Sequence, residues 1–155
     1  MSVSFKPAAP PDAELLLGLM REFYEFEHIE FVREDARRAL SQLLSDATLG
    51  RVWLIESGAE RAGYLVLTLG FSLEFKGRDA FVDELFLRAG FRGRGYGKSA
   101  LRFAEEACRA MGVRALHLEV ERANATAREV YRRSGFREHD RHLMTKWIEE
   151  EKSER

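Results

Sequence analysis

Residues 91–97 read Phe91-Arg92-Gly93-Arg94-Gly95-Tyr96-Gly97 and join an apolar, strand-like run to a helix-like run. A glycine-rich loop that opens a helix directs unpaired backbone N–H groups toward one point, and the helix dipole adds positive potential there. Five cationic side chains and no carboxylate lie between Leu85 and Ala104, although the whole chain carries a formal net charge of only −1. The stretch therefore predicts a phosphate-binding loop.

Two familiar phosphate-binding patterns do not fit this loop. A nucleotide-binding P-loop requires a glycine, four residues and then Gly-Lys-Ser/Thr. Gly97-Lys98-Ser99 supplies the end of that pattern, but Arg92 stands where its first glycine is needed. A dinucleotide fingerprint requires G-x-G-x-x-G near the first strand, whereas this loop reads G-x-G-x-G in the middle of the chain.

The segments around the loop predict a mixed sheet flanked by helices. Strand-like runs come first as a meander and then alternate with helices, an order that favours an α/β (α+β) fold. Asp12 and Asn124 are expected to cap helices, and the turn at 57–60 predicts a hairpin. Strands are expected at 3–6, 51–56, 62–69, 80–87 and 115–120, with further strand material at 136–137 and 143–147.

Composition limits the class of protein. A chain of 155 residues with 45% hydrophobic and 33% charged residues is expected to form one domain, residues 1–148, followed by a charged tail, residues 149–155. The near-neutral charge argues against a nucleic-acid partner, and no apolar run suits a membrane span or a leader. A single cysteine, Cys108, excludes an internal disulfide. We therefore expect a cytoplasmic protein.

Three blocks in order resemble the GNAT superfamily of N-acetyltransferases. The loop fits that family's Arg/Gln-x-x-Gly-x-Gly/Ala motif for acyl-CoA, from Arg92 to Gly97. The run 81–87 before it is similar to the family's fourth strand, and 118–136 is similar to its later strand, Asn, Ala, Tyr and Gly-Phe series. The resemblance implies a mostly antiparallel, twisted sheet of about six or seven strands with about four helices, splayed between the fourth and fifth strands.

The resemblance also implies how acetyl-CoA would be held. The pyrophosphate would bind backbone N–H groups of the loop, a concavity suited to anions. The pantetheine arm would pair with the open backbone edge of the fourth strand, at a bulge near Phe86 and Leu87, and Asn124 would cap its helix and contact the same arm. The side chains of Arg92, Arg94 and Lys98 either add charge or form a solvated basic face. The implied cofactor-binding residues are Phe86, Leu87, Arg92, Gly93, Arg94, Gly95, Tyr96, Gly97, Lys98 and Asn124.

Three residues are candidates for the chemistry. A protonated amine must lose a proton before it attacks a thioester, and Asp83 and Glu84 are the possible bases, acting directly or through water. The alternative is that both are structural and bulk water receives the proton. Tyr131 stands seven residues after Asn124, on the same helix face, where the family's tyrosine protonates the leaving sulfur; otherwise it is a core aromatic residue. No metal is expected, because His139 and His142 lack a third ligand nearby.

The acceptor is the least defined part of the prediction. The region implied to line its entrance contains many acids, which would favour a small cationic amine such as a polyamine or an amino acid; these acids are Glu22, Glu25, Glu27, Glu30 and Glu34. A protein N-terminus, a lysine or an aminoglycoside remains an alternative acceptor. A catalytically silent acyl-CoA-binding module is the alternative to an enzyme. Family members are often dimers, so a homodimer is expected.

Overall fold

A computed structural model describes residues 2–149. Two compact units make up the chain, residues 1–120 and residues 121–155. The first unit contains five strands, three α-helices and two short 3-10 turns, and the described part of the second contains one helix. In chain order they are β1 (Val3–Pro7), η1 (Pro10–Asp12), α1 (Ala13–Phe26), α2 (Arg33–Ser45), β2 (Gly50–Ser57), β3 (Glu60–Ser72), β4 (Gly77–Leu87), η2 (Ala89–Phe91), α3 (Tyr96–Ala110), β5 (Ala115–His117) and α4 (Ala125–Arg133).

The first unit is built on one mixed sheet in the order β1-β2-β3-β4-β5. The first four strands pair antiparallel in sequence order, while β4 and β5 pair in parallel. That last pairing covers only Asp79–Phe81 of β4 against Ala115–His117 of β5. Beyond Phe81, β4 therefore runs on without a strand partner on that side among residues 2–120, which confirms the expected splay.

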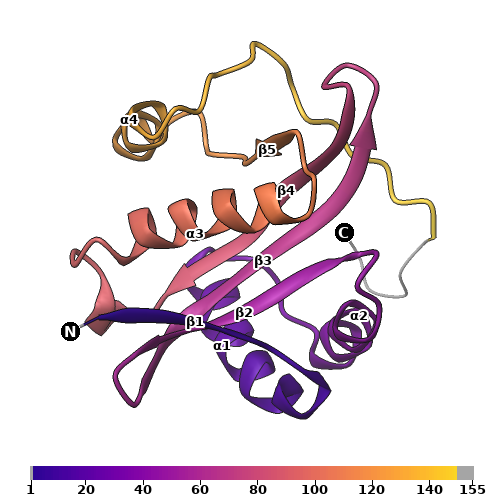
Figure 1. Cartoon of the computed structure of the whole chain (residues 1–155). Coiled ribbons are helices and arrows are strands. Elements are labelled where there is room, and N and C mark those ends of the chain that lie inside the picture. The colour runs from indigo at the N-terminus through magenta and orange to yellow at the C-terminus, as the bar shows by residue number, and fades with distance from the viewer. Residues whose placement is uncertain (1, 150–155) are drawn as a thin grey trace. The chain divides into compact units, whose positions relative to one another are not determined.

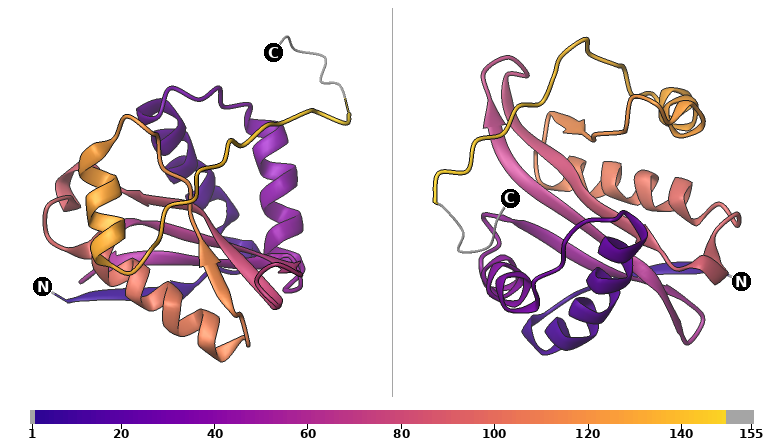
Figure 2. Two further views of the ribbon diagram at one scale, coloured as in Figure 1. Left: turned by 90° about the horizontal axis from the view of Figure 1, so that it is seen from above. Right: turned by 180° about the vertical axis from the view of Figure 1, so that it is seen from behind.

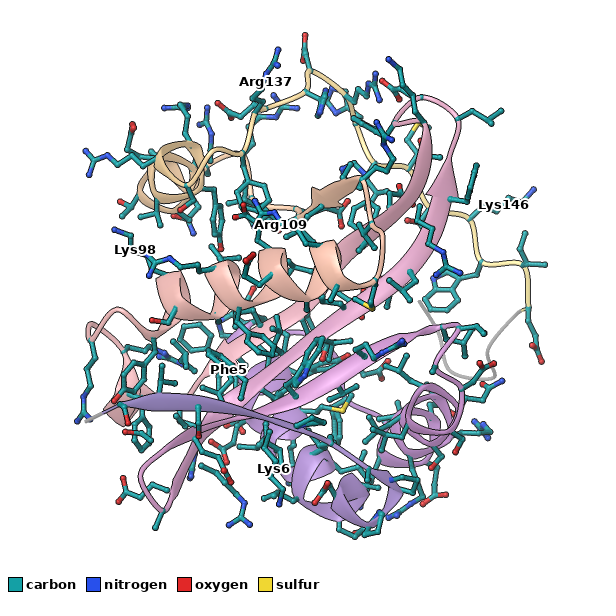
Figure 3. All side chains as sticks on the ribbon, in the orientation of Figure 1. Phe5, Lys6, Lys98, Arg109, Arg137 and Lys146 are labelled. Atoms are coloured by element: carbon teal, nitrogen blue, oxygen red, sulfur yellow. The ribbon has the colours of Figure 1, made fainter. Side chains whose placement is uncertain are left out.

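Helix α3 covers one face of this sheet (Figure 1). Its small buried residues Ala100 and Ala104, each 0% exposed, let the helix backbone approach the strands closely. Phe103 stacks on Phe5 of β1 with ring centroids 4.4 Å apart. Figure 3 shows Phe5 directed toward α3 and Lys6 directed toward the other face, the alternation expected of a strand.

Helices α1 and α2 cover the opposite face, as the views of Figure 2 also show. Leu16, Leu17 and Leu19 of α1 are buried there with Leu40 of α2. They pack on strand residues that point to this face and include aromatic rings; the buried ones are Val52, Leu54, Tyr64, Val66 and Phe86. Because both faces of the sheet are covered, the central strands read as near-continuous apolar runs rather than as alternating ones.

The described part of the second unit contains α4 and irregular chain. The Asn124 side chain accepts a hydrogen bond from the backbone N–H of Ala127 at 3.1 Å, so its predicted capping role is confirmed. Asp12, by contrast, makes no side-chain cap on α1. Its carboxylate accepts instead from the Ala9 N–H at 2.8 Å and closes the η1 turn that precedes the helix.

The structure corrects the number of strands. Residues 136–137 and 143–147, predicted as strands, form no strand in the described chain, and the predicted strand 115–120 is limited to Ala115–His117. The sheet of the described residues therefore has five strands rather than six or seven. The four α-helices match the expected number. Of the predicted tail, residues 150–155 lie outside the described residues.

Candidate active site

A β-bulge at Asp83 decides which acid faces α1. Val66 of β3 pairs with Glu84, and the next residue, Leu67, pairs with Val82, so Asp83 is the extra residue on β4. An extra residue reverses the alternation of side chains beyond it. Val82 accordingly packs with the α3-side core, while Glu84 is delivered to the α1 side of the sheet.

The predicted position of this bulge was wrong. Phe86 pairs regularly with Tyr64, and Leu87 pairs with Gly63, so the irregularity lies upstream of the expected place. Gly63 is required at that pairing, because a Cβ there would stand 1.8 Å from the Phe86 carbonyl oxygen. The backbone at the end of β4 thus approaches the backbone of β3 so closely that only glycine fits at position 63.

Glu84 is held by two phenols that come from different elements. Tyr64 of β3 donates a hydrogen bond to Oε1 of Glu84 at 2.8 Å. Tyr24 of α1 donates a hydrogen bond to Oε2 of the same carboxylate. Each carboxylate oxygen keeps further lone pairs, so this arrangement orients the group without exhausting it as a proton acceptor.

The surroundings of Glu84 shift the pKa of its carboxyl group upward. Burial raises the pKa of Glu84, and the adjacent Asp83 carboxylate adds to the rise, while the hydrogen bonds from Tyr24 and Tyr64 oppose it. Burial also raises the pKa of Asp83. Burial and then the interaction with Glu84 raise the pKa of both phenols, which therefore remain protonated hydrogen-bond donors.

The glycine loop exposes its backbone. Gly93 and Gly95 have φ angles of 76° and 81°, in the left-handed region that favours glycine. A Cβ added at either position would meet nothing within 4 Å, so these glycines face open space. Gly95 is the N-cap of α3 and supplies no side-chain cap, which leaves first-turn N–H groups of the helix available to a ligand.

The arginines of the loop are engaged with the protein. Arg92 donates from Nε to the Leu87 carbonyl oxygen at 2.8 Å, and its guanidinium lies 4.1 Å from the centroid of the Phe26 ring. Arg94 lies 5.4 Å from the centroid of the Phe91 ring. Arg92 thus connects the loop to the end of β4 and to α1, a role that neither of the two sequence interpretations contained.

Lys98 and Tyr96 lie on opposite sides of the first turn of α3. Lys98 is exposed on the side of the helix away from the sheet (Figure 3). Tyr96 is 6% exposed, and its hydroxyl shares a 2.8 Å hydrogen bond with the buried hydroxyl of Ser57. The Tyr96 side chain is therefore a core anchor that joins the start of α3 to β2, and only its backbone remains a candidate for contact with a cofactor.

Two further candidates, Asn124 and Tyr131, belong to the unit of residues 121–155 rather than to the unit that contains Glu84 and the loop. Within their unit, Asn124 begins α4 and Tyr131 lies near its end. The Tyr131 ring is half-buried and packs edge-on against Phe136, with centroids 6.2 Å apart. The predicted spacing of Asn124 and Tyr131 along one helix is confirmed.

The acidic region around α1 and α2 is partly neutralised. Glu22 pairs with Arg88 at 3.1 Å, Glu14 pairs with Arg33 at 2.7 Å, and Glu34 lies 3.6 Å from Arg37. An open hollow of about 300 Å³ lies at the end of α1. Its lining mixes both signs of charge with apolar groups and consists of Arg21, Glu25, Ile29, Phe31 and Arg33.

Residues 2–149 contain no cluster of three or more His, Cys, Asp or Glu side chains that would hold a metal ion. None of the helices in this range is both long enough and apolar enough to cross a membrane. Cys108 is buried on α3, and burial raises the pKa of its thiol, so it is a core residue rather than a nucleophile.

Comparison with known proteins identifies the family of this site. The sequence model of the acetyltransferase (GNAT) family matches residues 15–136. The chain belongs to the GNAT family. GNAT proteins use acetyl-CoA as the acetyl donor, and the matched region is accordingly an acetyltransferase domain. The match includes Tyr24, Glu84, the glycine loop and Tyr131.

Individual relatives agree with this assignment. The uncharacterized N-acetyltransferase YycN of Bacillus subtilis (strain 168) is 43% identical over 63 residues, which are 41% of this chain and 40% of that protein. The chain thus aligns with well under half of the length of this curated relative. The crystal structure of integron cassette protein HFX_CASS3, from the mobile metagenome of Cole Harbour Salt Marsh, is 39% identical, with a TM-score of 0.83 over 95% of this chain and 91% of that chain.

A more distant structure shares the fold. The predicted acetyltransferase of Clostridium acetobutylicum, solved with acetyl-CoA, is 17% identical and superposes with a TM-score of 0.78 over 94% of this chain and 96% of that chain. At this identity the likeness concerns the fold alone.

Sequence reasoning missed the two phenols and Gly63. Tyr24 and Tyr64 are 60 and 20 residues from Glu84 along the chain, and nothing in their local patterns connects them to it. Gly63 lies inside an apolar strand, where an isolated glycine is a usable signal for close backbone approach. That signal was available for Gly63, and none was available for the phenols.

Proposed function

We propose that this GNAT protein transfers an acetyl group from acetyl-CoA directly to a primary amine of a small acceptor, with Glu84 as the base. The observation that carries the proposal is the Glu84 carboxylate, which the bulge turns to the α1 side of the sheet and which two phenols orient. A carboxylate with a raised pKa, held in a defined position, is a stronger base than an ordinary carboxylate and is suited to accept a proton.

The donor is proposed to bind along the loop and β4. The pyrophosphate accepts hydrogen bonds from the loop backbone between Arg92 and Lys98, where Gly93 and Gly95 leave open space. The pantetheine amides pair with the edge of β4 beyond Phe81, which has no strand partner on that side among residues 2–120. A backbone N–H near Phe86 or Leu87 polarises the thioester carbonyl.

The reaction needs no covalent enzyme intermediate. The acceptor ammonium loses one proton to Glu84, directly or through a water, and the free amine forms a bond to the thioester carbonyl carbon. The carbon–sulfur bond then breaks, and the Tyr131 hydroxyl gives its proton to the departing sulfur. The proton that the new amide nitrogen loses restores the Tyr131 hydroxyl by way of solvent, and Glu84 gives its proton up to solvent. The products are an N-acetylated amine, free coenzyme A and one proton released to solvent.

The acceptor class remains part of the proposal. The exposed acids Glu25, Glu27 and Glu30 favour a small cationic amine of polyamine or amino-acid type, although arginines neutralise other acids nearby. The alternatives are a protein N-terminus or lysine as acceptor, and a silent acyl-CoA-binding module. A cytoplasmic location and a homodimer are proposed as well, the former because a single cysteine excludes an internal disulfide.

A screen of amine acceptors with detection of the free thiol tests this function. We expect turnover with at least one small amine, a fall in kcat of about 100- to 10,000-fold in Glu84→Gln, and a fall of about 10- to 100-fold in Tyr131→Phe. Asp83→Asn is the matched control, since it neutralises the adjacent acid, and it should retain most of the activity.

Different results would contradict the enzymatic activity, the acceptor class and the choice of base. Binding of acetyl-CoA without turnover of any amine would identify a silent module. Activity only on peptides would move the acceptor to the protein class. Loss of activity in Asp83→Asn, with Glu84→Gln active, would reassign the base.

A further inference from the structure

The two phenols that hold Glu84 differ in their access to solvent. Tyr64 is 1% exposed and packs among core residues of the α1-side cluster, so its hydroxyl has to find its partner inside the protein. Tyr24 is only half-buried and lies in the last turn of α1. A molecule that approaches Glu84 from solvent can therefore replace the Tyr24 hydrogen bond far more readily than the one from Tyr64.

Aromatic neighbours hold the Tyr24 ring in place. Phe31, in the connection between α1 and α2, packs edge-on against the ring with centroids 5.5 Å apart, and Phe23 does so at 5.7 Å. Phe31 also lines the open hollow at the end of α1. Tyr24 thus contacts both Phe31, which lines the hollow, and Glu84, the proposed base.

We propose that Tyr24 is a positioning residue of the reaction, whose hydroxyl holds Oε2 of Glu84 until the acceptor's ammonium group takes that oxygen over. This inference rests on the proposed function, because it gives Glu84 the role of base. It adds that the acceptor enters as an ammonium ion and that the exchange at Oε2 is the step that brings the acceptor's proton to the base.

The chemistry of the exchange favours an ammonium ion over a neutral group. A phenol gives the carboxylate a hydrogen bond from a neutral donor, whereas an ammonium gives one in which both partners are charged. The acceptor's ammonium group replaces the hydrogen bond from Tyr24 with one of its own, so the number of hydrogen bonds to Oε2 stays the same. A neutral amine would gain no such advantage, because its N–H is a weaker donor than the phenol.

The groups that face Glu84 come from three elements: Tyr24 of α1, Tyr64 of β3 and Asp83 of β4 itself. A further link between α1 and the end of β4 is the ion pair of Glu22 with Arg88, the residue that follows β4. The hydrogen bond from Tyr24 lowers the pKa of Glu84, against the effects of burial and of Asp83. Removal of this hydroxyl should therefore raise the pH at which Glu84 loses its proton.

The variant Tyr24→Phe tests the inference, since it keeps the ring and removes only the hydroxyl. With an amine found in the screen, we measure kcat/KM as a function of pH. We expect the acidic limb of this profile to shift to higher pH by about half to one pH unit. At pH values above the limb, KM for the amine should fall by about two- to tenfold, because no phenol competes for Oε2. Phe71→Leu is the control: it removes an exposed ring of β3 that pairs with Arg78, away from the Glu84 register, and should leave the limb at its wild-type pH.

A second measurement needs no turnover. In protein labelled with ¹³C at the glutamate carboxyl carbons, the Glu84 resonance is the one missing from Glu84→Gln, and in Tyr24→Phe it should titrate at higher pH than in wild type. Superimposable titrations, or a KM that rises in Tyr24→Phe, would overturn the inference. Full activity in Glu84→Gln would instead contradict the proposed base, so the two failures are distinguishable.

Discussion

The glycine loop and the Glu84 cluster are built in opposite ways. The loop is contiguous in sequence and exposes its backbone, with Gly93 and Gly95 facing open space. The cluster is assembled from Tyr24, Tyr64 and Glu84, on three different elements, and acts through side chains. The proposed donor site therefore depends on local backbone conformation, whereas the proposed base depends on long-range packing.

Two glycines make the same contrast at the level of single residues. Gly95 is needed because of its left-handed φ of 81°, with nothing within 4 Å of an added Cβ. Gly63 is needed because a Cβ would collide with the Phe86 carbonyl oxygen at 1.8 Å. A substitution at Gly95 should therefore affect the ligand, whereas one at Gly63 should affect the fold.

The largest effect is expected for Gly63→Ala. The β3–β4 pairing would have to separate to admit the methyl group, and we expect the free energy of unfolding to fall by about 3 kcal/mol or more. Chemical denaturation followed by circular dichroism measures it. Gly18→Ala is the control, because Gly18 is an exposed position of helix α1 and an added Cβ would meet nothing within 4 Å. Its free energy of unfolding should rise by up to about 1 kcal/mol. Equal stability of Gly63→Ala and wild type would refute the close approach.

A smaller loss is expected for Gly95→Val. The branched side chain would occupy the space proposed for the pyrophosphate and would strain the left-handed backbone by about 1–3 kcal/mol. We expect affinity for coenzyme A, measured by calorimetry, to fall about 100-fold, while circular dichroism shows a folded protein. Gly90→Val, in the preceding turn, should bind nearly as wild type does. Normal binding by Gly95→Val would place the pyrophosphate elsewhere.

The smallest effect concerns Arg92, which connects the two regions. If its guanidinium acts by contact with Leu87 and Phe26, then Arg92→Lys and Arg92→Gln should both lower the free energy of unfolding by about 0.5–1.5 kcal/mol, with similar affinities for coenzyme A. If Arg92 acts by charge on a phosphate, only Arg92→Gln should bind weakly. Calorimetry on the two variants distinguishes these roles, and the second pattern would contradict the structural one.

Local signals in the sequence predicted local structure well. The loop, the hairpin at 57–60 and the Asn124 cap depend on a few neighbouring residues, and each is found in the structure. The prediction failed where a distant partner decides the outcome. The strand-like residues 136–137 and 143–147 form no strand in the described chain. Strand propensity alone does not make a strand, because the backbone must find a partner to pair with.

The choice between Asp83 and Glu84 shows the same limit. Alternation along β4 allows only one of them to face α1, and the sequence does not say which, since a bulge shifts the alternation without leaving a signal in the residues around it. The bulge was expected near Phe86 and lies at Asp83. That displacement determines that Glu84 is the acid that reaches the phenols.

The glycine loop, the GNAT family and the acetyl-CoA donor that the family uses were all readable from the sequence, because they depend on contiguous residues whose spacing sets the backbone path. Only the tertiary structure decided the register of β4 against β3, the contact of Arg92 with α1, and the partners of Glu84. These features depend on residues up to 66 positions apart, as in the contact of Arg92 with Phe26. The fold brings them together by burying apolar faces, and the pattern of apolar residues does not specify which polar groups will meet.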